Sequence, residues 1–306
     1  MKRNIALWVM VLSFLVGTVL VIYPVACNLF YEKNQSYVLA QYDAAIAQND
    51  QMEMSAELQA AQEYNRGLLE GEAILADPFN SDMESGQAGD RYFELLNPEQ
   101  NGIMGYVEIP KISITLPIYH GTSAQVLERG VGHIPGTSLP VGGESTHTTL
   151  TAHTGMAGKR MFTDLSQVEK GDVFYIHVLG TILAYQVEEI WVVEPDDTEN
   201  LLIQPGRDLA TLMTCYPYGI NTQRLLVQGS RIPYSQALVQ QGEQNTEPQK
   251  NVWKLEYEKA VLLCLAIYLP LTAVVVLVLI RRGKRRSFRY QRNSGLQENE
   301  KEDQGT

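Results

Sequence analysis

Two residues of the chain, Cys215 and Arg224, have types and spacing that fit nucleophilic chemistry. Cys215 ends the strand-like run LATLMTC, and Arg224 begins the next run after the turn YPYGIN. Two strands joined by a short turn bring their ends together, so we expect the sulfur and the guanidinium at the same end of a strand pair. A thiolate is a nucleophile, and an arginine stays charged and can favour a thiolate or hold an oxyanion. The alternative is an inert cysteine in a packed core.

A thiol nucleophile needs a base, and the chain has five histidines: His120, His133, His147, His153 and His177. His153 follows the strand-like run TTLTA and precedes a turn with Gly155, which is where catalytic groups often lie. His177 lies inside a strand-like run, His147 precedes one, and the other two lie in turn-rich stretches. Position therefore favours His153 as the partner of the cysteine.

Two uncharged segments flank the middle of the chain, residues 5–26 and 260–280. At about 1.5 Å per residue, each is long enough to cross a hydrocarbon core of about 30 Å as a helix. Basic residues precede the first segment and follow the second, which predicts a cytoplasmic N-terminus (1–4) and a basic cytoplasmic tail (281–306). We therefore expect a two-pass protein of the cell membrane with an extracytoplasmic middle. A cleaved signal peptide, or a lipoprotein signal ending at Cys27, is the alternative for the first segment.

The predicted extracytoplasmic region is acidic. Residues 31–259 carry 14 Lys and Arg against 31 Asp and Glu, a net formal charge of −17. Such a surface does not attract nucleic acid and suits cationic partners. Cys215 is the only cysteine well inside this region, because the other two lie at the edge of one apolar segment and within the other. It therefore has no disulfide partner there.

The organisation of the middle changes along the chain. Helical spacing predicts a helical hairpin or bent helix over 31–75, and a polar loop follows over 76–90. That loop contains Asp77, Pro78 and Phe79, an aromatic residue stiffened by a proline. Short runs rich in Val, Ile, Thr and Tyr over 91–233 predict a mainly β domain, a sandwich or barrel. A Gln-rich stretch within 234–258 is interpreted as a linker to the second apolar segment.

The motifs around the candidate residues resemble those of a known family. TLMTC resembles the TLxTC signature of sortases, and Arg224 falls where their catalytic arginine lies. LTAHTG resembles the sequence around their catalytic histidine and gives His153. The second apolar segment and the DPF motif at Asp77–Phe79 resemble class C, the pilin-polymerising sortases.

This resemblance implies a fold and a reaction. The fold is a closed eight-stranded sortase-type β-barrel over 91–233. Cys215 attacks an LPXTG-type sorting signal between Thr and Gly, His153 donates a proton to the leaving amine, and Arg224 stabilises the oxyanion. In class C the acyl group then passes to a lysine amine of a pilin subunit. The resemblance implies no cofactor and no metal, and it makes Asp77, Pro78 and Phe79 a lid in which Asp77 pairs with Arg224 and Phe79 covers Cys215 and His153.

Three alternatives remain at this point. A housekeeping sortase would use a peptidoglycan amine in place of the pilin lysine. A non-catalytic pilus scaffold would have Cys215 as a buried core residue. A cysteine peptidase is the third, but no separate Asn or Asp motif that would orient the histidine is evident.

Overall fold

The computed structural model describes residues 2–69, 75, 77–79, 89–156 and 158–244, and scattered residues between 262 and 281. Contacts divide the chain into two units, residues 1–249 and 250–306. Only scattered helical residues of the second unit are described, so most of the predicted segment 260–280 and the basic tail 282–306 lie outside the described residues. The fold below is that of the first unit.

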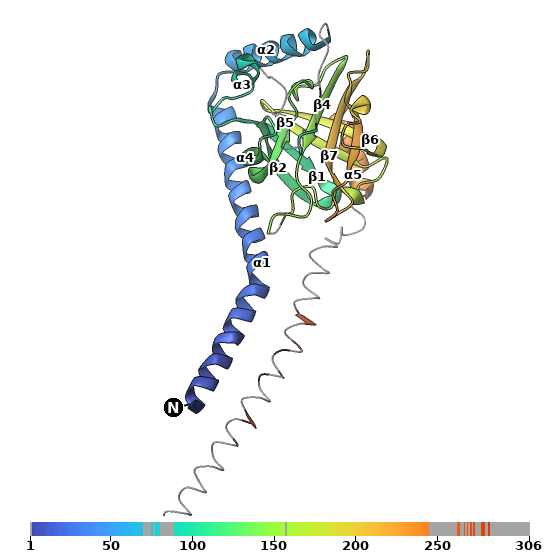
Figure 1. Cartoon of the computed structure of the whole chain (residues 1–306). Coiled ribbons are helices and arrows are strands. Elements are labelled where there is room, and N and C mark those ends of the chain that lie inside the picture. The colour runs from blue at the N-terminus through green and yellow to red at the C-terminus, as the bar shows by residue number, and fades with distance from the viewer. Residues whose placement is uncertain are drawn as a thin grey trace, which may run out of the picture. The chain divides into compact units, whose positions relative to one another are not determined.

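The first unit contains a closed β-barrel with the strand order β1-β2-β3-β4-β7-β8-β6-β5 (Figure 1). The mainly β class and the closed eight-stranded barrel expected from the family resemblance are thereby confirmed. The strands are β1 (Ile103–Ile109), β2 (Ile114–His120), β3 (Val131–His133), β4 (Thr146–Thr151), β5 (Val173–Val178), β6 (Thr181–Val193), β7 (Asp208–Tyr216) and β8 (Gln223–Ile232).

Successive side chains along each strand point alternately into the barrel and out of it, which gives a packed interior and a partly covered outer face. Leu212 of β7 and Leu225 of β8 belong to the interior core. Their neighbours Met213 and Leu226 point the other way and form a separate cluster on the outer face. Most pairs are antiparallel, but β2–β3 and β4–β7 are parallel. The parallel β4–β7 pair matters below because it joins segments far apart in sequence.

Five helices accompany the barrel among the described residues: α1 (Lys2–Gln48), α2 (Gln51–Leu69), α3 (Asp90–Glu94), α4 (Ala124–Arg129) and α5 (Tyr234–Gln244). Helices at the N-terminus were expected, and α1 and α2 meet near Asp50, whose carboxylate accepts from the N–H of Met52 at 3.2 Å. Three single-turn 3-10 helices also occur: η1 (Pro110–Ile112), η2 (Leu165–Gln167) and η3 (Glu199–Leu201).

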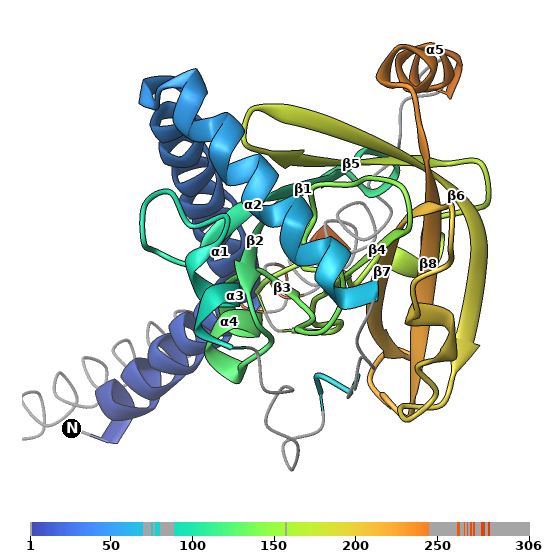
Figure 2. The ribbon, with the colours of Figure 1, turned by 90° about the horizontal axis from the view of Figure 1, so that it is seen from above.

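The N-terminal helices are fixed to the barrel by polar contacts. The Tyr42 hydroxyl on α1 donates to the carbonyl of Met104 at 3.0 Å and accepts from the N–H of Leu179 at 3.0 Å. The Asn65 side chain on α2 bonds both the N–H and the carbonyl of Leu139. Figures 1 and 2 show α2 lying across one end of the barrel.

The predicted first apolar segment, 5–26, lies within α1. Among the described residues, none of the helices combines the length and the hydropathy that crossing a membrane requires. The two membrane segments therefore stay a prediction.

Two expectations about local structure were wrong. The stretch interpreted as the start of a linker forms α5, because Ala237 buries itself against Val173 and Tyr175 on the outer face of the barrel. The other error concerns the histidines. His120 and His133 end β2 and β3 and do not lie in turns, and His147 lies inside β4 and not before it. Pro and Gly close to these histidines gave the sequence a turn-like pattern at the strand ends.

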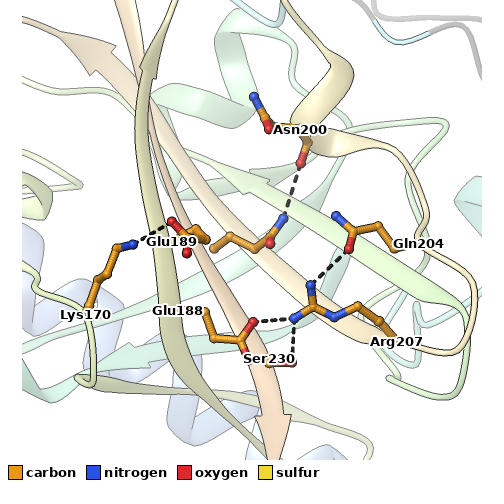
Figure 3. A network of polar contacts seen from close by, with 8 residues as sticks. Lys170, Glu188, Glu189, Asn200, Gln204, Arg207 and Ser230 are labelled. Atoms are coloured by element: carbon orange, nitrogen blue, oxygen red, sulfur yellow. Dashed lines mark hydrogen bonds and ion pairs between the residues drawn. The ribbon is translucent and has the colours of Figure 1, made fainter.

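A polar network fastens the β6–β7 connection (residues 194–207) to the barrel, as Figure 3 shows. Arg207 pairs with Glu188 of β6. The buried Gln228 of β8 donates through its Nε2 to the carbonyl of Asn200 at 3.3 Å. These contacts hold η3 over the outer face of β7 and β8, beside the cluster of Met213 and Leu226.

Gly105 in β1 provides a test of how tightly the barrel is closed. A Cβ atom at this position would lie 2.2 Å from the backbone oxygen of His177 on β5, so an alanine forces the two strands apart. We expect Gly105→Ala to reduce the free energy of unfolding by about 1–3 kcal/mol or more. Thermal and denaturant unfolding measure this loss. Gly89→Ala is the control, because nothing lies within 4 Å of its Cβ; equal stability of the two variants would contradict this account of the packing.

Candidate active site

Cys215 and Arg224 lie directly opposite each other in the antiparallel β7–β8 pair. Residues facing each other in such a pair have Cβ atoms about 4.5–5.5 Å apart. Both side chains lie on the outer face, since Cys215 continues the alternation of Met213 and Arg224 that of Leu226. The sulfur is nearly enclosed, with Cys215 only 8% exposed.

The parallel β4–β7 pair brings His153 to the same place. Thr151 is paired with Met213, and the next residue, Ala152, donates its N–H to the carbonyl of Met213 at 3.2 Å. The Thr214 hydroxyl donates back to the carbonyl of Ala152 at 2.7 Å. Continuing this register places His153 beside Cys215, on the outer face and partly exposed.

Of the loop 76–90, the structure describes residues 77–79, 89 and 90, and the rest lie outside the described residues. We call residues 77–79 the lid segment, after the family resemblance, and they pack against this group. Asp77 accepts two hydrogen bonds from Arg224, from Nε to Oδ1 at 2.8 Å and from Nη2 to Oδ2 at 2.6 Å. Both side chains of the ion pair are 8% exposed. Paired parallel bonds of this kind are strong and geometrically specific. The Nη1 group of Arg224 donates to the carbonyls of Asn221 and Gln223, which orients the guanidinium from the β7–β8 turn.

Phe79 covers the histidine. Its ring centroid lies 5.4 Å from that of His153, and the Arg224 guanidinium carbon lies 5.2 Å from the same phenyl centroid. The Phe79 side chain and Leu75 also pack against the outer-face cluster of Met213, Leu226 and their neighbours. Pro78 separates the two anchoring residues in a turn. The lid segment is thus fixed at an ionic contact and an apolar one.

Burial holds both reactive groups in their neutral forms while the lid segment is closed. It raises the pKa of the Cys215 thiol; the Arg224 charge opposes this, and the Asp77 carboxylate adds to it. Burial also lowers the pKa of His153, with Glu128 opposing the shift and Lys159 adding to it. Both shifts favour the neutral thiol together with the neutral imidazole. Because a thiolate is the nucleophile, the closed site is poorly reactive.

The structure brings together all six residues singled out in the sequence: Cys215, His153, Arg224, Asp77, Pro78 and Phe79. The sequence argument missed Glu128 and Lys159, whose charges act on His153. It also missed the β6–β7 connection, which reaches the site through the 3.0 Å bond from Gln223 to Glu194. No spacing rule links these residues to the histidine. Among the described residues, no cluster of three or more potential metal ligands occurs.

Comparisons with known proteins agree with this arrangement. A family model described as Sortase domain matches residues 107–232. Sortase D of Bacillus subtilis (strain 168) is 32% identical over 138 residues, which cover 44% of this chain and 67% of that protein. The crystal structure of Streptococcus pneumoniae sortase C is 44% identical with a TM-score of 0.59, covering 65% of this chain and 97% of that one. Sortase C-1 from Actinomyces oris is 45% identical with a TM-score of 0.55, covering 60% and 99%.

The chain therefore belongs to the sortase family, whose members are cysteine transpeptidases. Its structural neighbours at 40–45% identity are class C sortases. The first of these structures is described with reference to pilin substrate specificity.

Proposed function

We propose that this sortase joins pilin subunits, with Cys215 as the nucleophile, His153 as the general acid and base, and Arg224 as the oxyanion stabiliser. The observation that supports the proposal is the Asp77–Arg224 ion pair, because a class C-type lid is expected to make this contact with the catalytic arginine. The class C neighbours, one of them described as a pilus-related sortase C of Group B Streptococcus, support the same assignment.

The first half-reaction transfers an acyl group to the enzyme. The Cys215 thiol passes its proton to His153, and the thiolate that results attacks the carbonyl carbon between Thr and Gly of an LPXTG-type sorting signal. The guanidinium of Arg224 donates to the oxyanion that forms, and such donors act most strongly where water is excluded. His153 gives a proton to the glycine nitrogen as the C–N bond breaks, which leaves a thioester on Cys215.

The second half-reaction consumes the thioester. A lysine amine of the next pilin attacks the thioester carbonyl, His153 takes the proton lost by the amine, and the C–S bond breaks to regenerate Cys215. The product is an isopeptide bond between two subunits. Water competes with the lysine amine for the thioester. The amine wins this competition when its local concentration is high, and holding enzyme and substrates on one surface raises that concentration.

Membrane anchoring supplies that surface. In our proposal residues 5–26 and 260–280 span the cell membrane, both termini are cytoplasmic, and the barrel is extracytoplasmic. The support is the charge pattern of the sequence: an uncharged run on each side of the acidic middle, with basic residues outside both.

The lid segment has to leave before a sorting signal can bind, because Asp77 occupies the guanidinium that the oxyanion needs. Its carboxylate stands where negative charge would develop on the substrate. The closed structure is therefore an autoinhibited state, and substrate binding competes with the Asp77–Arg224 pair.

Mass spectrometry of the protein incubated with an LPXTG-type peptide tests the chemistry. We expect an adduct equal in mass to the acyl fragment on Cys215 in the wild type, and none in Cys215→Ala. Replacing the peptide with a pilin that carries both its sorting signal and its acceptor lysine is then expected to give protein ladders. Transfer of the acyl group to an added peptidoglycan-type amine, but not to the pilin lysine, would identify a housekeeping sortase. The absence of an adduct even from Asp77→Ala would contradict the enzymatic proposal.

A further inference from the structure

The segment that follows His153 is packed against α1. We call residues 152–156 and 158–163 the His153 connection. Gly158 has a φ of +75°, and a Cβ atom built on it would lie 2.6 Å from the Cβ of Cys27 on α1. The Tyr31 hydroxyl, one turn further along α1, donates to the carbonyl of Arg129 at 3.1 Å and lies 3.1 Å from the sulfur of Met161. The N-terminal helix therefore touches the connection at two places.

Lys159 is the residue of the connection that reaches both neighbouring helices. Its Nζ donates to the carbonyl of Glu128 on α4 at 2.6 Å. The same ammonium lies 5.5 Å from the ring centroid of Tyr31 on α1, within range of a cation–π contact. One side chain thus joins three segments that are distant in sequence.

Two hydrogen bonds join the C-terminal end of the His153 connection to its start at His153. The N–H of Phe162 donates to the carbonyl of His153 at 3.0 Å. The N–H of Gly155 donates to the hydroxyl of Thr163 at 3.2 Å. Lys159 lies in the loop that these bonds close, so its contacts with α1 and α4 hold the same segment that begins beside His153.

The charged groups near the imidazole come from several elements. Glu128 of α4 and Lys159 of the connection act on it with opposite signs. The phenyl ring of Phe79 covers it from the lid segment. Cys215 of β7 and Arg224 of β8 lie on the side of the strands. Lys159 comes from the connection and not from the strand pair, and its charge disfavours a second positive charge at His153.

We propose that Lys159 is a positioning residue for His153: it ties the segment that follows the histidine to α1 and α4 and places a positive charge near the imidazole. This inference rests on the proposed function and extends it, because the N-terminal helix then becomes part of what orients the histidine. Tyr31 and the carbonyl of Glu128 are the contacts through which it acts.

The test compares Lys159→Met with Lys159→Arg in the full-length protein in detergent micelles. Asp77→Ala is present in every sample, so that lid opening does not limit the rate. The first measurement is the pH profile of kcat/KM for acyl transfer from an LPXTG-type peptide. Loss of the ammonium leaves the imidazolium stable to higher pH, so we expect the acid limb to move to higher pH in Lys159→Met. We also expect a rate loss on the order of tenfold from mispositioning.

Lys159→Arg is expected to keep the acid limb at the pH found for Lys159 and to keep the rate within about twofold, because an arginine can make the same charged contacts. Lys170→Met is the matched control, since that lysine pairs with Glu189 at 2.6 Å. A uniform rate loss with an unmoved acid limb, or no change at all, would overturn the proposal. Unfolding midpoints of the variants show whether a loss reflects stability alone.

An NMR titration of the His153 ring separates this inference from the proposed function. It reports proton uptake by the imidazole whether or not any sample transfers an acyl group. If no sample is active but the midpoint rises in Lys159→Met and not in Lys159→Arg, the proposed function fails and the electrostatic part of the inference stands. If the enzyme is active but the midpoint of the His153 titration is the same in Lys159→Met as in the parent protein, the inference is wrong and the proposed function stands.

Discussion

Replacing Asp77 with alanine is expected to accelerate alkylation of Cys215 by a small thiol reagent by a factor on the order of ten or more. Two effects act together. The lid segment loses its two bonds to Arg224, so the sulfur becomes accessible. The Asp77 carboxylate also raises the pKa of the thiol, and its removal increases the thiolate fraction at neutral pH. The rate constant of iodoacetamide labelling, followed by mass spectrometry, measures the outcome.

The pH dependence of labelling distinguishes the two effects. Removing a carboxylate that raises the pKa of Cys215 moves the midpoint of the labelling profile to lower pH, whereas better access alone raises the rate at every pH. Phe79→Ala is expected to improve access with a smaller change in midpoint, because it removes no charge. Asp196→Ala, an exposed carboxylate of the β6–β7 connection, is the control. Unchanged rates in both lid variants would show that the lid segment does not protect the thiol.

Replacing Arg224 with glutamine is expected to lower kcat for acyl transfer by about 10²–10³-fold, the usual cost of losing one oxyanion donor. The same substitution breaks the ion pair with Asp77, so the lid segment opens and the sulfur becomes accessible. The rate of Cys215 alkylation is then expected to rise while kcat for acyl transfer falls. Steady-state kinetics with a sorting-signal peptide, beside alkylation of Cys215, measure both in one preparation.

Arg231→Gln is the matched control, because this residue lies on the same strand and its Nη1 is 4.0 Å from Asp208, away from the site. Arg224→Lys keeps a charge and loses the planar fork, so we expect it to recover only part of the activity. An Arg224→Gln enzyme as fast as Asp77→Ala would mean that the guanidinium serves only to hold the lid segment.

The pairing of Cys215 with Arg224 is the part of the site that physical reasoning reached from the sequence. A short turn between two strand-like runs fixes which ends meet, and the observed register puts these residues opposite each other. The position of His153 was predicted less securely. It depends on the parallel β4–β7 pair, and nothing local in the sequence encodes a partner strand more than fifty residues away.

The lid segment came from the family motif alone. The bonds from Arg224 to Asp77 span 147 residues, and a polar loop carries no periodicity that predicts where it lies. The helix α5 was missed because its Gln-rich sequence resembles a linker, and only the contact of Ala237 with β5 identifies it as part of the fold. The contacts of Lys159 were unpredictable for a similar reason: side chains from three separate segments meet there.

The β4–β7 pairing has a consequence for the newly made chain. Pairings between distant segments form late, since closing a long loop costs entropy before any contact is gained. Until that closure, the sulfur of residue 215 has neither its imidazole neighbour nor a shaped pocket, and it behaves as an ordinary thiol. Folding is therefore required before the chain can transfer an acyl group, and opening of the lid segment is a second, separate requirement.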